Sequence, residues 1–256
     1  IALLILSEIK QYDLRQMWIL LLSIILLATI NFFDDLYNLT AKLRFSIQSL
    51  IAALIIYSVY PIQLNFVLFS LNNPIVTSFF LFFSIIWAIN HFNFMDGLDG
   101  FCVSQAIFLF VTYAVLFSVY PAPLYQDFCF ILISCLLGFL RFNFPPAKLF
   151  MGDIGSATLG LITFSFAIIG QQKYDIPILY WFILNSLFLF DATITLIRRI
   201  LNKEEWFAAH KKHAYQRIKQ LGVSSEIILL GQLIINIMVF SCVWLFDTSN
   251  VKSGVI

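Results

Sequence analysis

Long apolar runs separated by short polar segments dominate the chain, and their lengths predict most of its structure. The hydrocarbon core of a bilayer is about 30 Å thick and takes about 20 apolar helical residues to cross. Continuous apolar runs of this length favour helices over the alternating strands of a membrane barrel. The predicted spans lie near 17–33, 46–62, 75–91, 102–120, 127–142, 155–170, 176–198 and 226–246. We therefore expect an all-α, polytopic transmembrane helix bundle with about eight full spans.

The first residues, 1–6, form an apolar stub that is too short to cross a bilayer. The chain begins with Ile1 and not with Met, so we expect the upstream part of the gene, and with it the rest of this partial N-terminal span, to be missing. No internal repeat, low-complexity stretch or linker divides the sequence. We expect residues 1–256 to form a single transmembrane domain.

Composition narrows the class of protein further. Apolar residues make up 61% of the chain and charged residues only 11%, which excludes a soluble enzyme. The net charge of +1 provides no overall field that would recruit nucleic acid, so any electrostatic function must be local. The four cysteines lie in apolar runs without the spacing of a metal site, and a disulfide framework is not expected.

Lysine and arginine are distributed unequally between the two sets of loops. One set carries Lys10, Arg15, Lys173 and Lys252, and the other carries Lys42, Arg44, Arg141, Lys148, Arg198, Arg199, Lys203, Lys211, Lys212, Arg217 and Lys219. Because cytoplasmic loops hold the excess of these residues, the richer set is predicted to face the cytoplasm: 34–45, 91–101, 141–154 and 198–225. The longest polar stretch, 199–225, predicts a helix at the membrane surface, since apolar residues alternate with its cations: Trp206, Phe207, Ile218 and Leu221.

Four polar clusters fall on this predicted cytoplasmic side. In the most informative one, four oxygen-bearing residues follow one another at intervals of three: Asn90, Asn93, Asp96 and Asp99. On a helix this spacing sets the four side chains along one ridge. Charged residues this close to a membrane span are costly and are functional by default, with a mere helix terminator as the alternative. His91, between them, is interpreted as a polar interface residue rather than a catalyst.

Two further clusters carry carboxylates. Asn31 precedes the adjacent acids Asp34 and Asp35, whose mutual repulsion is tolerable where a cation or water offsets it; a solvated helix end is the alternative. The segment 144–156 offers Lys148 as a charge for phosphate and places Asp153 at the start of a helix, beside free backbone N–H groups. An ordinary helix N-cap is the alternative there.

The fourth cluster is basic. On a helix His210 and His213 would share one face, but a zinc site needs further His or Cys ligands and none is near in sequence. These histidines, with Arg217, suit a diphosphate better, and a basic membrane-surface helix is the alternative. Across the four clusters, hard oxygen ligands beside phosphate-binding cations indicate Mg²⁺, or Mn²⁺ with the same ligands. We therefore expect phosphoryl-type chemistry at a membrane face, with a lipid as one substrate.

In this order, and on alternate loops, four segments resemble a known family: FFDDLYNLTAKLR, NHFNFMDGLDG, FNFPPAKLFMGDIGS and AHKKHAYQR. They are similar to those of the polyprenyl-phosphate N-acetylhexosamine-1-phosphate transferases, glycosyltransferase family 4. The resemblance extends over nearly the whole chain. The His-x-x-His-x-Tyr-Gln-Arg form is closer to the bacterial enzymes that initiate O-antigen and enterobacterial-antigen synthesis than to the peptidoglycan enzyme.

The resemblance implies a bacterial inner-membrane enzyme that depends on Mg²⁺. It would transfer a sugar 1-phosphate from a UDP-N-acetylhexosamine to undecaprenyl phosphate among the membrane lipids and release UMP, and a homodimer is one option for its assembly. Carried over by motif, Asp153 would coordinate the metal together with Asn93, and Phe150 would stack on the uracil. The other implied catalytic residues are Asp34, Asp35, Asp96 and Asp99, and the other implied substrate-binding residues are Asn90, Lys148, His210, His213 and Arg217.

Two points stay open at this stage. An aspartate could attack covalently, or the lipid phosphate could attack directly, which is the reading we favour. The hexosamine is also open among N-acetylglucosamine, N-acetylfucosamine, N-acetylquinovosamine and a diamino sugar.

Two other classes of protein fit the sequence less well. An intramembrane aspartyl protease predicts a Gly-x-Gly-Asp motif, whereas this chain has Met151-Gly152-Asp153. A secondary transporter keeps its ionisable groups near the midplane of the membrane. Here almost all of them lie at one face, and Asp191 is the exception inside a predicted span.

Overall fold

A computed structural model of the chain describes residues 1–67, 69–205 and 210–253. Apart from one short hairpin, its regular elements are helices. In chain order they are α1 (Ala2–Lys10), the 3₁₀ helix η1 (Leu14–Met17), α2 (Trp18–Tyr37), α3 (Ala41–Val59), β1 (Leu64–Asn65), β2 (Ser70–Leu71), α4 (Pro74–Phe94), α5 (Phe101–Val119), α6 (Pro123–Asn143), α7 (Gly152–Tyr174), α8 (Leu179–Leu184), α9 (Ser186–Leu201), α10 (Ala214–Gln220) and α11 (Ser225–Ser253). The two strands pair antiparallel, with Leu64 opposite Leu71.

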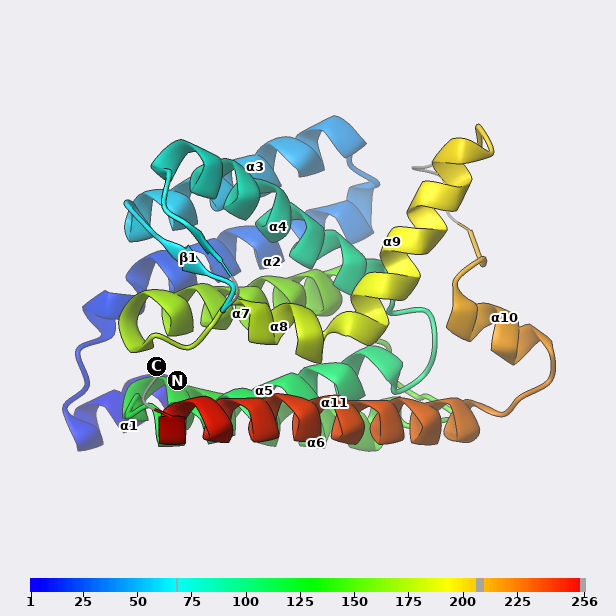
Figure 1. Cartoon of the computed structure of the whole chain (residues 1–256). Helices are drawn as coiled ribbons and strands as arrows, with labels where there is room; N and C mark the ends of the chain where they lie inside the picture. Colours follow the sequence, from blue (N-terminus) through cyan, green and yellow to red (C-terminus); the bar gives the residue numbers. More distant parts are fainter. Residues whose placement is uncertain (68, 206–209, 254–256) are drawn as a thin grey trace.

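Seven helices in the described part of the chain are long and apolar enough to cross a membrane: α2, α3, α4, α5, α6, α7 and residues 225–247 of α11. Each coincides with a run predicted from the sequence, so the all-α, polytopic membrane fold is confirmed. The helices lie side by side with their ends at two opposite faces of the bundle (Figure 1). The protein is thus an integral, multi-pass membrane protein.

The prediction of eight full spans is wrong at residues 176–198. There the chain forms two helices, α8 and α9, which meet at Asn185. Asn185 is fully buried, and its side-chain amide lies 2.6 Å from Nε2 of His91. At the break the carbonyl of Leu184 lacks the backbone N–H partner that it would have in a continuous helix. The side-chain amide of Gln105 donates to it instead, at 3.3 Å. A polar residue with buried partners therefore interrupts what hydropathy alone predicts as one helix.

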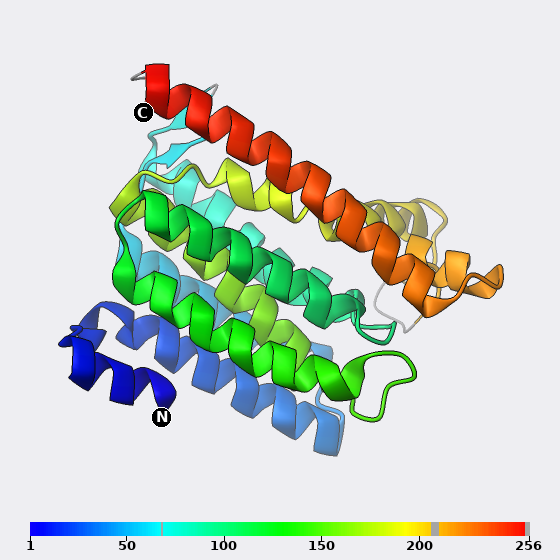
Figure 2. The same ribbon diagram turned by 90° about the horizontal axis from the view of Figure 1, so that it is seen from below.

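The interior of the bundle lies around α5 and α7. In the apolar 18-residue stretch that identifies each helix as a membrane span, 61% of α5 and 67% of α7 are buried inside the structure, against 17% of α11. Seen from below, α11 runs along one side of the bundle (Figure 2). Many of its large apolar side chains are exposed, among them Ile227, Leu230 and Leu233. In a membrane protein such exposed apolar surface faces lipid.

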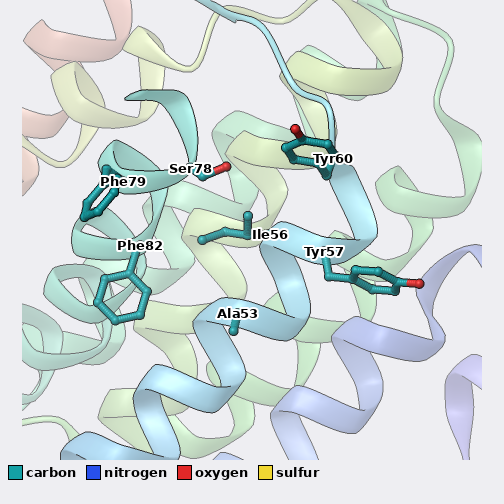
Figure 3. A pocket seen from close by; sticks show the side chains of 7 residues that line it. All are labelled: Ala53, Ile56, Tyr57, Tyr60, Ser78, Phe79 and Phe82. Atoms are coloured by element: carbon teal, nitrogen blue, oxygen red, sulfur yellow. The ribbon is translucent and has the colours of Figure 1, made fainter. Parts of the chain in front are cut away.

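An apolar groove lies on the outer surface between α3 and α4 (Figure 3). Its lining is almost entirely carbon: Ala53, Ile56, Tyr57, Tyr60, Ser78, Phe79 and Phe82. These residues come from the end of α3 and the start of α4. The groove therefore lies away from the polar clusters, which are at the other ends of the same two helices.

The four polar clusters share one end of the bundle. The loops between α2 and α3, α4 and α5, and α6 and α7 lie at the right of Figure 1, with α10 beside them. The start of α1 and the end of α11 lie at the opposite end, together with the β1–β2 hairpin. We call these the polar end and the hairpin end of the bundle.

Candidate active site

Hydrogen bonds join the four polar clusters to one another at the polar end. Asn31 donates to the backbone carbonyl of Asp153 at 3.1 Å, which ties α2 to α7. Asn93 donates to the hydroxyl of Ser156 at 3.2 Å, which ties α4 to α7. Three of the four clusters, although separated by whole spans in sequence, are therefore in direct contact through α7.

The two adjacent acids of α2 have different environments. Asp34 is buried, accepts from Nη1 of Arg44 at 2.8 Å, and accepts from the backbone N–H of Leu39 at 2.8 Å. It therefore fastens the α2–α3 loop to the end of α2. Asp35 is exposed, and one of its carboxylate oxygens lies beside Gly152, where an added Cβ would come within 3.3 Å of it. Only Asp35 of the pair is thus presented next to the start of α7.

The predicted ridge along α4 stops at Asn93. The helix ends at Phe94, so Asp96 and Asp99 lie in the turn that follows and not on a helical face. The turn ends at Gly100 with a φ of 77°, a left-handed conformation that glycine adopts without steric cost. The helix terminates one residue after Asn93, so the spacing of three residues continues beyond the helix that it predicts.

The turn after α4 is held against the loop between α6 and α7. The carboxylate of Asp99 accepts from the backbone N–H of Ala147 at 3.0 Å. Asn143 accepts from the N–H of Gly100 at 3.0 Å and donates to the carbonyl of Leu149 at 2.8 Å. Asp99 and Asn143 therefore fix the relative position of two loops that carry candidate site residues.

Asp153 lies in the first turn of α7, between two other carboxylates. It interacts electrostatically with Asp35 and with Asp96. Burial, together with the negative charge of Asp153, raises the pKa of Asp96 to about 7. Among the described residues, none of these three acids forms an ion pair. The arrangement therefore concentrates negative charge at the start of α7 and favours a cation there.

The N-cap alternative for Asp153 is not what the structure shows. Met151 occupies the N-cap position of α7, and no side chain caps the helix. The hydroxyl of Ser156 donates to the carbonyl of Gly152 at 3.0 Å, so it also satisfies no free N–H of the first turn. Asp153 is therefore not explained as a helix cap.

The loop between α6 and α7 presents its two substrate-binding candidates outward. Phe150 is 73% exposed, and Lys148 is exposed as well. An exposed aromatic ring beside an exposed ammonium provides a stacking surface and a point charge. Neither of these two side chains is buried in the protein interior.

Asn90 lies at the interface of α3 and α4. Its side-chain amide donates to Oε1 of the buried Gln48 at 2.8 Å and to the carbonyl of Ile86 at 2.7 Å. These contacts give Asn90 a helix-packing role that the sequence did not reveal. Its predicted role in substrate binding stays a prediction.

The basic cluster differs from the predicted surface helix. Only α10 is helical, His213 is its N-cap, and His210 precedes it, although the two imidazole rings lie 4.9 Å apart. Of the apolar residues in the prediction, Trp206 and Phe207 lie outside the described residues. Burial and the nearby charge of Arg199 lower the pKa of His210 to about 4. His210 is thus neutral at neutral pH and offers hydrogen bonds rather than charge.

α10 presents two exposed cations, Arg217 and Lys219. The same short helix carries the buried Tyr215, whose hydroxyl donates to the carbonyl of Phe94 at 3.3 Å. The basic cluster is thereby brought against the turn that contains Asp96.

Four residues of the site are not among the candidates from the sequence: Arg44, Asn143, Asp191 and Tyr215. Arg44, Asn143 and Tyr215 lie in the segments that carry the family resemblance and Asp191 lies inside a predicted span, but no local spacing assigns a role to any of them. Asn143 stands at the end of an apolar run. Such a residue has many structural explanations, and its two loop contacts become evident only in the folded chain.

The carboxylates at the polar end are of the ligand type that Mg²⁺ takes in proteins. Within the described residues no group of three or more His, Cys, Asp or Glu side chains is placed to hold a metal ion. Mg²⁺ does not require one, because it commonly takes one or two carboxylates and completes its shell with water and phosphate oxygens. Asp153 with Asp35 or Asp96 would provide such an open set, and the excess of negative charge at this point favours it.

Comparison with known proteins gives a consistent result. Residues 17–171 match the model of the family described as "Glycosyl transferase family 4". A probable undecaprenyl-phosphate N-acetylglucosaminyl 1-phosphate transferase of Bacillus subtilis (strain 168) is 31% identical over 234 residues, which cover 86% of this chain and 63% of that protein.

Two phospho-N-acetylmuramoyl-pentapeptide-transferases are also similar. The protein of Staphylococcus haemolyticus is 34% identical over 148 residues, covering 54% of this chain and 46% of that protein. The protein of Listeria monocytogenes serotype 4b is 32% identical over 191 residues, covering 68% of this chain and 58% of that protein. The chain thus spans between about half and two thirds of the length of these relatives.

Proposed function

Because the chain belongs to glycosyl transferase family 4, we propose that it transfers an N-acetylhexosamine 1-phosphate from a UDP-sugar to undecaprenyl phosphate and releases UMP. The observation that carries this proposal is the electrostatic interaction of Asp153 with Asp35 and with Asp96 at the polar end of the bundle, where none of the three has an ion-pair partner among the described residues. A phosphoryl transfer between two anionic substrates needs a site that holds a cation and positions phosphates.

The bond changes are simple. An oxygen of the lipid phosphate attacks the β-phosphorus of the UDP-sugar, and the bond from that phosphorus to the bridging oxygen breaks. UMP leaves with the bridging oxygen, and a lipid diphosphate sugar forms. This direct displacement is preferred over an aspartyl intermediate because Asp34, one of the paired acids, is buried and already bound by Arg44.

The site residues take the following roles in this proposal. Asp153, with Asn93 beside it, would hold Mg²⁺, or Mn²⁺ in its place, which when bound neutralises the diphosphate charge and favours departure of UMP. Asp35 accepts the proton of the lipid phosphate if it arrives protonated. Phe150 stacks on the uracil, and Lys148 binds phosphate from the same loop.

The remaining candidates act on the donor from the other side. Arg217 binds the diphosphate, whereas the neutral His210 and the buried His213 offer hydrogen bonds to the sugar or phosphate. Asp96 and Asp99 shape the turn that faces Asp153, and Asp99 does so through its bond to Ala147.

The distribution of Lys and Arg supports a cytoplasmic position for the polar end, in a bacterial inner membrane. Transfer of N-acetylglucosamine 1-phosphate, rather than of a phospho-N-acetylmuramoyl pentapeptide, is supported by the N-acetylglucosaminyl relative, whose match covers 86% of the chain. Initiation of an O-antigen-like polysaccharide is the role that we propose for this transfer. Whether the enzyme works as a homodimer does not affect the chemistry proposed here.

The proposal is tested by UMP release from purified protein in nanodiscs with undecaprenyl phosphate and a panel of UDP-N-acetylhexosamines. The 256-residue chain and the reading frame extended upstream to a start codon are assayed in parallel. Release that requires the lipid, stops with EDTA and returns with Mg²⁺ supports the transferase and identifies its sugar. Absence of release from both proteins with every donor would overturn it.

A further inference from the structure

The short helix α10 is fastened to two other parts of the protein, one on each side. On one side, Asp191 of α9 accepts from the backbone N–H of Ala214 at 2.9 Å, and Thr195 donates to the same carboxylate oxygen at 3.1 Å. The imidazole Nδ1 of His213 lies 3.4 Å from this oxygen. A carboxylate at the N-terminus of a helix satisfies free N–H groups and complements the helix dipole.

On the other side, Tyr215 lies over the turn that follows α4. Its ring packs against Phe101 with centroids 4.9 Å apart, and its hydroxyl donates to the carbonyl of Phe94 at 3.3 Å. The fit is close at Gly97, because a Cβ at that position would overlap the Tyr215 hydroxyl. The φ of Gly97 is not left-handed, so its backbone conformation does not require glycine. Glycine is favoured here because there is little space beneath the tyrosine.

These contacts connect two groups of residues that the proposed reaction needs together. Gly97 follows Asp96 directly, and Tyr215 lies between His213 and Arg217 on the same short helix. A helix of seven residues has little stability of its own and depends on its tertiary contacts. The position of Arg217 relative to Asp96 is therefore set by the contacts of Asp191 and Tyr215.

We propose that Asp191 and Tyr215 are positioning residues, which hold α10 against the Asp96 turn and so set the binding of the sugar-nucleotide donor without touching it. This inference rests on the proposed function for its link to the donor. The fastening itself is a property of the fold and can be measured without any activity.

Tyr215→Phe is the most direct variant, because it removes the hydroxyl and keeps the ring against Phe101. Its matched control is Tyr113→Phe in α5, where the hydroxyl of a fully buried tyrosine has no hydrogen-bond partner in the structure. We expect Tyr215→Phe to raise the KM for the UDP-sugar about 3- to 10-fold, as for the loss of one hydrogen bond. The KM for undecaprenyl phosphate stays unchanged, a split that general destabilisation would not produce.

A second pair of variants tests the contact with Gly97. Gly97→Ala alone pushes the Tyr215 hydroxyl away and weakens donor binding. Combining Gly97→Ala with Tyr215→Phe removes the overlapping oxygen, and the atoms nearest to the new Cβ would then be Nε2 of Gln216 at 2.9 Å, the end of a flexible side chain, and a ring carbon of residue 215 at 3.3 Å. We expect the double variant to bind the donor better than Gly97→Ala does, although each single change is harmful.

The role of Asp191 is tested by comparing two replacements. Asp191→Asn keeps an oxygen that can accept from Ala214, whereas Asp191→Leu removes every acceptor. We expect Asp191→Leu to raise the donor KM and Asp191→Asn to restore most of the wild-type value. Equal effects of the two replacements would contradict a positioning role through hydrogen bonds.

The closing experiment measures the fastening directly, as the rate of tryptic cleavage after Arg217 in detergent-solubilised protein. If α10 is held as we propose, Tyr215→Phe is cleaved at least about 3-fold faster than Tyr113→Phe, in line with one lost hydrogen bond. Equal cleavage rates would overturn the inference even if the enzyme is active. Faster cleavage in a protein that releases no UMP with any donor would instead overturn the proposed function and leave the fastening of α10 established.

Discussion

The two ends of the bundle use the same acidic residue type in opposite ways. At the hairpin end two aspartates have partners that neutralise or bind them: Lys10 donates to Asp127 at 2.6 Å, and Tyr120 and Tyr180 donate to Asp247 at 2.8 and 2.9 Å. At the polar end Asp35, Asp96 and Asp153 interact with one another, and no ion pair is formed by them within the described residues.

This difference indicates which acids stabilise the fold and which serve another purpose. An acid with a bonded partner contributes to stability or costs little, whereas carboxylates held close together repel each other and destabilise the protein. A protein retains such a destabilising arrangement where it needs the carboxylates for binding a cation or a substrate. The contrast therefore predicts that replacements at the two ends separate activity from stability.

The largest effect is expected at Asp153. Asp153→Asn keeps the shape of the side chain but removes the charge between Asp35 and Asp96. We expect UMP release to fall by about 10²- to 10³-fold, the range seen for loss of one electrostatic group at a reacting centre. Resistance to unfolding should not decrease, because one repelling charge is gone.

Asp127→Asn at the hairpin end is the matched control for Asp153→Asn. It breaks an ion pair whose lysine is 46% exposed, so the loss of stability should be below about 1 kcal/mol, and UMP release should remain within about 2-fold of wild type. A drop in activity as large as that of Asp153→Asn would show that the two ends do not differ as proposed.

The second largest effect is expected at Asp247, where stability rather than activity should fall. Asp247 is buried, and Asp247→Leu would leave the hydroxyls of Tyr120 and Tyr180 without their acceptor. Two such losses lower the free energy of unfolding by about 2 kcal/mol, while the activity of the folded fraction is unchanged. Unfolding in mixed detergent and SDS micelles, followed by tryptophan fluorescence, measures the stability. An activity loss larger than the loss of folded protein would contradict the contrast.

How far the sequence predicts this structure depends on whether a feature is local. Span length is local, so α2 to α7 and α11 were predicted to within a few residues. The break at Asn185 was missed because hydropathy averages over a window and does not register the buried partners His91 and Gln105. Termination of α4 before Asp96 was missed for a related reason, since a spacing of three residues fits a helix whether or not the helix continues.

The candidate site shows the same division. Motifs on separate loops predicted that Asp35, Asp96 and Asp153 would lie near one another, because helix ends at one membrane face must meet. The residues that fix their geometry were not predictable in this way. Asn143 joins two loops only after four helices have packed, and Asp191 contacts residues 22 to 24 positions away, across a segment with no regular spacing.

Asp34, unlike its neighbour Asp35, has a cationic partner at the polar end, and it tests whether partners rather than position decide the role of an acid. It is 8% exposed and bonded to Arg44, which is 40% exposed. Arg44→Leu leaves this carboxylate without its cation, and we expect a loss of about 1 to 2 kcal/mol, because half-exposure of the arginine reduces the value of a buried pair. The same micelle unfolding assay measures it.

Lys42→Leu serves as the control for Arg44→Leu, since it removes an exposed cation from the same turn of α3. Its stability should stay within about 0.5 kcal/mol of wild type. If both variants lose equal stability, the pairing of Asp34 is not what distinguishes it from Asp35.

The smallest effect is expected at His210. The cations that surround it at the polar end favour its neutral form. Its pKa is about 4 in the folded protein, lowered by burial and by Arg199, against about 6.5 in an unfolded chain. Below pH 6.5 the unfolded chain therefore binds a proton that the folded protein does not, so stability falls as the pH is lowered toward 4. At pH 5.5 the loss amounts to about 1 kcal/mol after allowance for solvent screening. His210→Gln cannot take up this proton, so its stability should change less than that of wild type between pH 7.5 and 5.5. Equal changes in the two proteins would mean that other groups already balance the positive charge around His210. Within the polar end, charge of one sign would then be concentrated only at the carboxylates.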